Sequence, residues 1–224
     1  MSLHSRHAVY FMPPEGPLAS FGATWLGWDA QAGRDVPQFD LPGLDTLTDT
    51  PRKYGFHATL KPPFRLAEGE SVEVLHDAVD ALAARTAPAW ADGLVLSRLG
   101  RFLALTPDGD NSDIARVAAA CVQDLDQFRA PASEAELERR RAAGLDARAE
   151  DLLRDWGYPY VLDRFRFHMT LTGKIAREDL DRVEAMVAEA LPPLPQPFVL
   201  DSICLCGERE DGRFELLHRY ALSG

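Results

Sequence analysis

The chain has 224 residues, 46% of them hydrophobic, and a formal net charge of −11 with a pI near 5.0. Its length and apolar content suffice for the core of one domain or of two closely joined lobes, and its acidic balance argues against broad, backbone-led nucleic-acid binding, which needs clustered Lys and Arg. It contains no apolar run long enough for a signal peptide or a membrane helix, so we expect a soluble, cytoplasmic protein with no membrane partner.

The segment before residue 56 predicts a strand, a helix and a loop. Residues 8–12 form an apolar run that stops at Pro13 and Pro14, which is typical of a strand. Residues 18–28 carry large apolar side chains at helical spacing. Residues 37–51, with their Gly, Asp and Thr, predict a loop that leads into the next strand.

Residues 56–60 read Phe-His-Ala-Thr-Leu and predict a strand with two unlike faces. Alternate residues of a strand point to the same side, so His57 and Thr59 share one face while the apolar residues share the other. We expect this strand to end at Pro62 and Pro63, because proline donates no hydrogen bond to a neighbouring strand.

The middle of the chain is predicted to be largely helical. Residues 71–85 have the pattern of an amphipathic helix, and residues 94–106 predict a hairpin that turns near Gly100. A helical segment at about 111–157 follows. It is marked by an apolar stripe after Ser112, a capping box of Ser133 with Glu136, and a helix from Asp146 to Gly157.

The motif then recurs, because residues 167–171 read Phe-His-Met-Thr-Leu, 111 positions after the first copy. Such a repeat is too rare to expect by chance from this composition, and internal repeats mark repeated structural units. His168 and Thr170 share one face of the second strand. A helix at 177–191 and a closing hairpin of strands at 198–206 and 213–222 are expected after it.

Each half of the chain therefore supplies a strand with a histidine, a following helix and a hairpin. This pattern predicts an α+β fold with two pseudo-symmetric lobes of antiparallel sheet, outer helices and a central groove. We expect residues 1–224 to form a single two-lobed domain, with the helical segment at about 111–157 between the two motif halves.

Two imidazoles that face one centre can act as base and acid in a single displacement, because histidine exchanges protons near neutral pH. Each comes with a hydroxyl two residues on, which can hydrogen-bond a phosphoryl oxygen. His57 and His168 are thus the candidate catalytic residues, and Thr59 and Thr170 the candidate phosphate ligands. The sequence does not reveal which histidine is the acid.

The stretches RKYGFHATLKPPF (52–64) and GYPYVLDRFRFHMTLTGKI (157–175) resemble the two-histidine phosphoesterase superfamily, defined by two His-x-Thr/Ser motifs on strands that line a groove. Within it they look like an uncharacterised branch associated with phosphonate-utilisation operons. The resemblance implies two pseudo-symmetric lobes, and it implies cyclic phosphates of RNA ends or nucleotides as the usual substrates of relatives.

Five further residues are candidate substrate ligands. Lys61 and Lys174 lie at the same strand parity as the histidines, and the planar guanidinium of Arg166 suits phosphate or phosphonate oxygens. Tyr54 and Tyr10 could stack on a base or ribose, although packing in the core accounts for them equally well.

These observations predict a metal-independent phosphodiesterase that acts on a small cyclic phosphate, or on a nucleotide-like or phosphonate-pathway ester, with no cofactor. A non-catalytic sensor of a phosphorylated or phosphonate metabolite is the alternative. A metal-dependent hydrolase is a third reading, disfavoured because no carboxylate lies near the motifs at ligand spacing. Cys121, Cys204 and Cys206 lack further ligands nearby and are expected to be buried and reduced.

Overall fold

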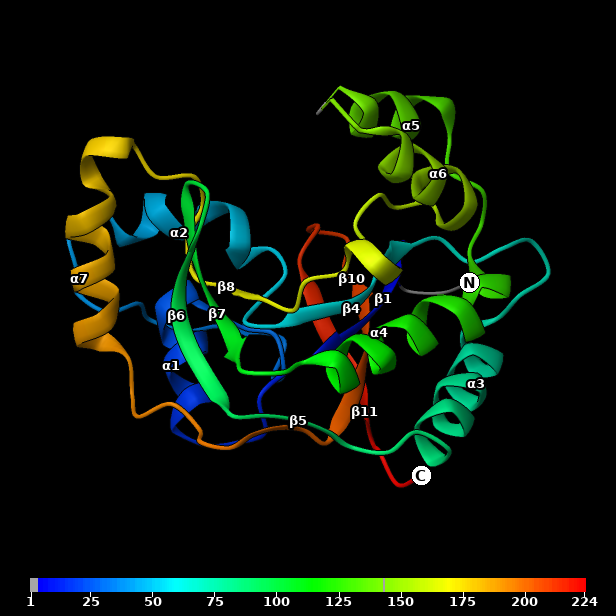
Figure 1. Cartoon of the computed structure of the whole chain (residues 1–224), viewed down its shortest axis with the longest axis horizontal. Helices are drawn as coiled ribbons and strands as arrows, with labels where there is room; N and C mark the ends of the chain where they lie inside the picture. Colours follow the sequence, from blue (N-terminus) through cyan, green and yellow to red (C-terminus); the bar gives the residue numbers. More distant parts are fainter. Residues whose placement is uncertain (1–3, 143) are drawn as a thin grey trace.

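A seven-stranded antiparallel sheet forms the centre of the molecule in the computed structural model, which describes residues 4–142 and 144–224 (Figure 1). The strand order is β11-β10-β1-β4-β8-β7-β6, and every pair of neighbours is antiparallel. The strands are β1 (His7–Phe11), β4 (Ala58–Phe64), β6 (Gly93–Leu99), β7 (Phe102–Asp108), β8 (Met169–Thr170), β10 (Ser202–Glu208) and β11 (Phe214–Ala221). Two small ladders pair β2 (Trp28–Asp29) with β3 (Arg34–Asp35) and β5 (Ala89–Ala91) with β9 (Phe198–Leu200).

The two motif strands, β4 and β8, are neighbours in the middle of this sheet. In the sheet, β1 lies next to β4 on the side away from β8, and the β10-β11 hairpin lies beyond β1. The β6-β7 hairpin lies next to β8 on the opposite side. The hairpin that follows the first motif in sequence therefore pairs with the second motif strand, and the hairpin that follows the second motif lies on the side of the first, separated from it by β1. The predicted α+β class is confirmed, and the two halves share one continuous sheet.

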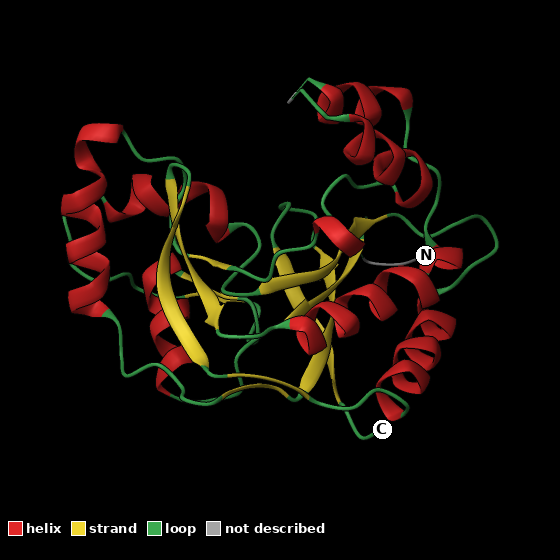
Figure 2. Ribbon diagram, in the orientation of Figure 1, coloured by secondary structure: helices red, strands yellow, loops and turns green. Residues whose placement is uncertain are grey.

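Helices lie on the outside of the strands at both ends of the molecule (Figure 2). Their starts follow capping chemistry: the side chains of Ser71 and Asp146 accept hydrogen bonds from Val74 and Ala149, and Ser133 with Glu136 forms the predicted capping box. The helices are α1 (Pro17–Leu26), α2 (Leu44–Arg52), α3 (Val72–Ala84), α4 (Ser112–Asp124), α5 (Glu134–Arg141), α6 (Ala147–Trp156) and α7 (Leu180–Ala190). Single 3₁₀ turns occur at Asp126–Phe128, Leu162–Arg164 and Arg177–Asp179.

Helix α2 contradicts the loop predicted at 37–51. It begins after Gly43 in the left-handed conformation and buries Leu44, Thr48 and Pro51. It is short, and its Thr, Asp and Pro residues have low helix propensity and are common in loops, which is why the sequence pattern predicts a loop. The Thr48 hydroxyl donates to the Leu44 carbonyl at 2.7 Å, one helical turn back.

Strand β4 continues to Phe64, past the two prolines at which it was predicted to end. β4 has two register shifts against β1, and it pairs with β8 only at Ala58. The missing N–H groups of Pro62 and Pro63 therefore fall where the ladder is irregular or unpaired. Strand β8 is shorter than predicted, since Thr172 leaves the strand and its hydroxyl accepts a hydrogen bond from the Leu103 N–H at 3.0 Å.

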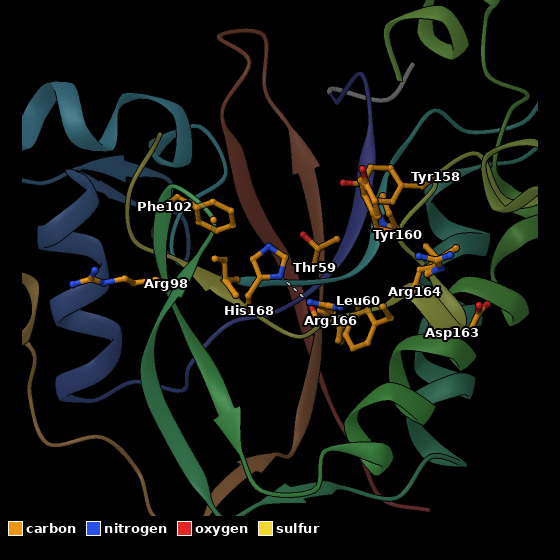
Figure 3. Close-up of a pocket in the computed structure, with 15 residues that line it drawn as sticks. Thr59, Leu60, Arg98, Phe102, Tyr158, Tyr160, Asp163, Arg164, Arg166 and His168 are labelled. Atoms are coloured by element: carbon orange, nitrogen blue, oxygen red, sulfur yellow. Dashed lines mark hydrogen bonds between the residues drawn. The ribbon is translucent and has the colours of Figure 1, made fainter. Parts of the chain in front are cut away.

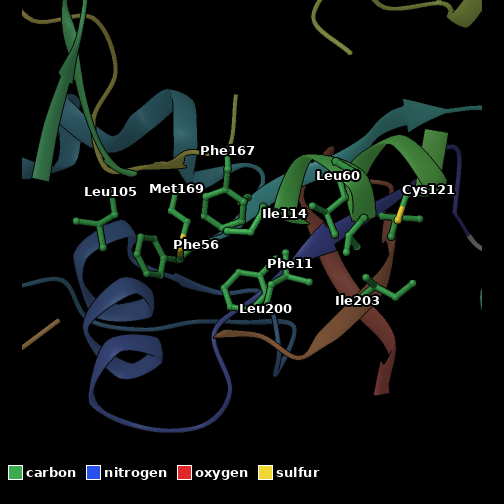
Figure 4. Packing of buried hydrophobic residues seen from close by; sticks show 14 of the residues in the cluster. Phe11, Phe56, Leu60, Leu105, Ile114, Cys121, Phe167, Met169, Leu200 and Ile203 are labelled. Carbon is green, nitrogen blue, oxygen red and sulfur yellow. The ribbon is translucent and has the colours of Figure 1, made fainter. Parts of the chain in front are cut away.

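The apolar face of both motifs belongs to the main hydrophobic core (Figure 4). Ala58 and Met169, the pair that joins β4 to β8, are both inaccessible to solvent. Phe167 packs against Phe11 and Phe198, with ring centroids 5.9 and 5.4 Å apart. The core thus fixes the back of both motif strands, so their polar faces are held on a rigid support. No helix in the described part of the chain is both long and apolar enough to cross a membrane.

Candidate active site

The pairing of β4 with β8 places the two motifs in a reciprocal arrangement. Ala58 is opposite Met169, so in an antiparallel register Thr59 faces His168 and His57 faces Thr170. Side chains directly opposite each other lie about 5 Å apart, and diagonal neighbours such as the two histidines about 7–8 Å. At that separation two imidazoles can contact a single phosphoryl group.

Both imidazoles are oriented by the same backbone contact. His57 Nδ1 lies 2.9 Å from the Gly55 carbonyl oxygen, and His168 Nδ1 lies 2.8 Å from the Arg166 carbonyl oxygen, two residues back in each case. A carbonyl only accepts, so each Nδ1 carries the proton and donates it. Each neutral ring is thereby left with a lone pair on Nε2, the atom that can take up a proton from a reactant.

His57 is half-buried beneath two aromatic rings. The Tyr10 ring lies 3.9 Å from the imidazole, centroid to centroid, and the Tyr54 ring 6.0 Å. Burial lowers the pKa of His57 to about 4, with a further contribution from His168, while the hydrogen bond to Gly55 partly opposes the shift. His57 is therefore neutral near pH 7.

A cavity of about 730 Å³ opens beside the motif face (Figure 3). Thr59 and His168 lie in its wall, and Thr59 Oγ1 is 3.1 Å from His57 Nε2, which places the His57 ring next to the cavity. Phe102 contributes a ring 6.0 Å from that of His168. The remaining wall residues come from β4, the β6-β7 turn and residues 158–166: Leu60, Pro62, Arg98, Leu99, Gly100, Tyr158, Tyr160, Val161, Asp163, Arg164, Phe165 and Arg166.

Of the predicted substrate ligands, Arg166 lies in the cavity wall and is exposed. Tyr54 and Tyr10 contact His57 instead, and Tyr10 is inaccessible to solvent. Thr170 is half-buried opposite His57, and Lys174 is exposed and outside the cavity wall.

Lys61 does not lie in the cavity wall, although strand parity predicted a place there beside Thr59. Its ammonium donates to the Val122 carbonyl at 3.0 Å and pairs with Asp126 at 3.5 Å, and burial lowers its pKa to about 8. The reason is a β-bulge: Val9 pairs with Lys61 and Tyr10 with Thr59, so Leu60 is an extra residue and the alternation shifts after it.

The aromatic part of the cavity wall was not predicted. Phe102 lies on the hairpin next to β8, and Tyr158 and Tyr160 lie in the segment that enters the second motif. Two tyrosines in GYPYVLDRF, directly before a catalytic motif, were the available signal. Nothing local to Phe102 indicates that its strand pairs with β8.

The cysteines are free and buried, as predicted. Burial raises the pKa of Cys121 to about 12 and that of Cys204 to about 11, so these thiols stay protonated. Within residues 4–142 and 144–224, no three His, Cys, Asp or Glu side chains are grouped closely enough to hold a metal ion.

Comparison with known families gives a match over residues 59–215 to the family described as "Protein of unknown function (DUF1045)". The chain belongs to this family. The matched range includes Thr59 and the whole second motif.

Two curated relatives carry the name "Ribose 1,5-bisphosphate phosphokinase PhnN". The protein from Janthinobacterium sp. (strain Marseille) is 38% identical over 221 residues, which cover 93% of this chain and 48% of the relative. The protein from Laribacter hongkongensis (strain HLHK9) is 40% identical over 185 residues, which cover 78% of this chain and 42% of the relative. The chain thus spans about half the length of the curated relatives it matches.

Among solved structures, the chain is similar to one described as a phosphoesterase, with 17% identity, a TM-score of 0.45 and 99% of both chains covered. It is also similar to E. coli LigT complexed with 3'-AMP, with 15% identity, a TM-score of 0.46 and 99% of both chains covered.

Proposed function

We propose that this protein is a metal-independent cyclic phosphodiesterase of the two-histidine type. The observation that carries the proposal is the antiparallel pairing of Ala58 with Met169 at the centre of the sheet, a register that puts Thr59 across from His168 and His57 across from Thr170. Both Nδ1 atoms are held by backbone carbonyls, which leaves the Nε2 atom of each neutral ring unprotonated. In the free protein the Thr59 hydroxyl donates to His57 Nε2, and in the proposed complex it turns to the phosphate and frees that nitrogen for proton transfer.

In the proposed reaction, neutral His57 takes a proton from a water molecule as the water oxygen bonds to phosphorus. The bond between phosphorus and the leaving oxygen of the ring breaks, and protonated His168 gives its proton to that oxygen. The product is a phosphate monoester with a free hydroxyl. Thr59 and Thr170 donate hydrogen bonds to the non-bridging oxygens, where negative charge develops.

His57 is assigned the role of base because burial keeps it neutral. A bound phosphate adds a negative charge beside the ring, which favours the imidazolium and strengthens His57 as a proton acceptor. This assignment supports hydrolysis near neutral pH.

The cavity supports a small sugar or nucleoside cyclic phosphate as substrate. Phe102, Tyr158 and Tyr160 offer aromatic rings to a sugar or base, and about 730 Å³ is within the usual range for a small-molecule site. The relatives are named for a kinase of ribose 1,5-bisphosphate, a phosphorylated sugar, which supports a sugar phosphate as the class of substrate here.

We do not propose the kinase reaction for this chain. The match covers less than half of either relative, and the sequence lacks the Gly-x-x-x-x-Gly-Lys-Ser/Thr loop that binds nucleotide phosphates.

The test is a turnover assay with 2′,3′-cyclic nucleotides and ribose cyclic phosphates, in which ³¹P NMR monitors the reaction with and without EDTA. We expect conversion to a monoester that is unaffected by EDTA and absent in His57→Ala. Binding without turnover would favour a sensor, and activity lost to EDTA and restored by zinc or manganese would favour a metal-dependent hydrolase.

A further inference from the structure

One half-buried cationic side chain, Arg140, makes no ion pair or hydrogen bond through its guanidinium with the part of the chain that the structure describes. Several Lys and Arg side chains make neither an ion pair nor a side-chain hydrogen bond with any described residue, and among these only Arg140 is half-buried, the others being exposed. Burying part of a guanidinium without an acceptor costs free energy, so such a group calls for a ligand. The lack of an ion pair is unusual here, because a protein with a net charge of −11 has many carboxylates that could pair with an arginine.

Arg140 stands over a residue of the cavity wall. Its guanidinium carbon lies 4.8 Å from the centre of the Tyr158 ring, within range for a cation–π contact. Burial lowers the pKa of Arg140, Tyr158 and the charge of Glu136 oppose that shift, and the charge of Arg6 adds to it. Arg140 therefore lies behind Tyr158, one of the aromatic side chains of the cavity wall.

Helix α5 contributes no buried side chain to the core. It is held by ion pairs at both ends, from Glu136 to Arg65 at 3.2 Å and from Arg141 to Glu150 of α6 at 2.7 Å. In Figure 1, α5 and α6 lie side by side at one end of the molecule, away from the central sheet. Helix α5 therefore adds no side chain to the core, but it places the Arg140 guanidinium against Tyr158 of the cavity wall. Binding of a ligand by Arg140 would explain this placement.

We propose that Arg140 binds a second, terminal phosphate of the substrate, at a distance from the phosphate that reacts. This inference rests on the proposed function and narrows the substrate class to cyclic phosphates that carry an additional phosphomonoester. The planar fork of the guanidinium suits two oxygens of a terminal phosphate, and stacking on Tyr158 fixes its plane. Arg166, exposed in the cavity wall beside His168, is left for the reacting phosphate.

The test is a binding comparison of two probes that differ only in a 5′-phosphate, 3′-AMP and adenosine 3′,5′-bisphosphate, by isothermal titration calorimetry. We expect the unmodified protein to bind the bisphosphate about 10-fold to 100-fold more tightly, as for a charge-assisted contact. Arg140→Gln should remove most of this preference while leaving 3′-AMP affinity within about twofold. Arg140→Lys should keep part of it.

Arg139→Gln is the matched control, because this exposed neighbour on α5 bonds only its own helix, at the Ala135 carbonyl. It should retain the full preference. Equal affinity of the unmodified protein for the two probes, or an undiminished preference in Arg140→Gln, would overturn the inference. Because the probes are not turned over, this result is separate from the proposed reaction, whose failure would appear as absent hydrolysis of any cyclic phosphate.

Discussion

The titration of His57 offers a sharp test of the assigned base. Its pKa is lowered to about 4 from an ordinary value of 6.5, chiefly by burial under the rings of Tyr10 and Tyr54. A shift of this size corresponds to about 3 kcal/mol against the charged imidazole. We therefore expect the His57 ring to remain neutral down to about pH 4 in the free protein, and the acid limb of kcat/KM to follow it.

The measurement is an NMR titration of the imidazole C–H signals, with the His57 signal assigned by its loss in His57→Gln. Tyr10→Leu removes the nearer ring and should move the pKa of His57 upward toward 6.5. Tyr10→Phe is the matched control, because it keeps the ring and deletes a buried hydroxyl that bonds no described residue. A His57 signal that titrates near 6.5 in the unmodified protein, or is unmoved by Tyr10→Leu, would refute the argument.

Three further predictions concern stability and substrate contacts. His7 is buried without a hydrogen-bond partner among the described residues, and burial lowers its pKa to about 4. Stability should therefore be intact above pH 6.5 and fall by up to about 3 kcal/mol as pH drops toward 4, because only the unfolded state takes up the proton. His7→Leu should flatten this dependence in urea unfolding, whereas His218→Leu, at an exposed site, should not; an unchanged slope in His7→Leu would contradict it. Lys61→Met should alter the free energy of unfolding but leave KM within about twofold, since the ammonium contacts Val122 and Asp126 outside the cavity; a KM raised about tenfold would restore Lys61 as a ligand. Thr59→Val keeps the strand-compatible shape but deletes the hydroxyl. In steady-state assays kcat/KM should fall by a factor that corresponds to about 1 to 3 kcal/mol of lost transition-state stabilisation. An unchanged kcat/KM would show that Thr59 does not contact the substrate.

Sequence reasoning worked best where structure depends on local chemistry. The caps at Ser71, Ser133 and Asp146 marked helix starts correctly, because a capping hydroxyl or carboxylate is satisfied within three residues. The division of each motif into an apolar back and a polar front also holds, since it requires only the alternation of a strand.

Its failures have a different physical origin. Lys61 was misplaced because the bulge at Leu60 depends on how β1 pairs with β4, which no local pattern encodes. Phe102 is brought to the cavity by the pairing of its strand with β8, and Arg140 contacts Tyr158 from a different segment, and neither contact is encoded locally. Helix α2 was missed because it is short and rich in Thr, Asp and Pro, residues that favour loops, so its composition outweighed its apolar spacing.

The central claim is that His57 and His168 act together on one phosphoryl group, and comparing single and double variants tests it most directly. On a cyclic phosphate that the unmodified protein hydrolyses, His57→Ala and His168→Ala should each lower kcat by roughly 10² to 10⁴. The double variant should lose little beyond the worse single one, because acid and base serve the same step. His218→Ala controls for loss of an exposed imidazole. Near-normal turnover in both single variants would contradict the account and make the repeated motif purely architectural.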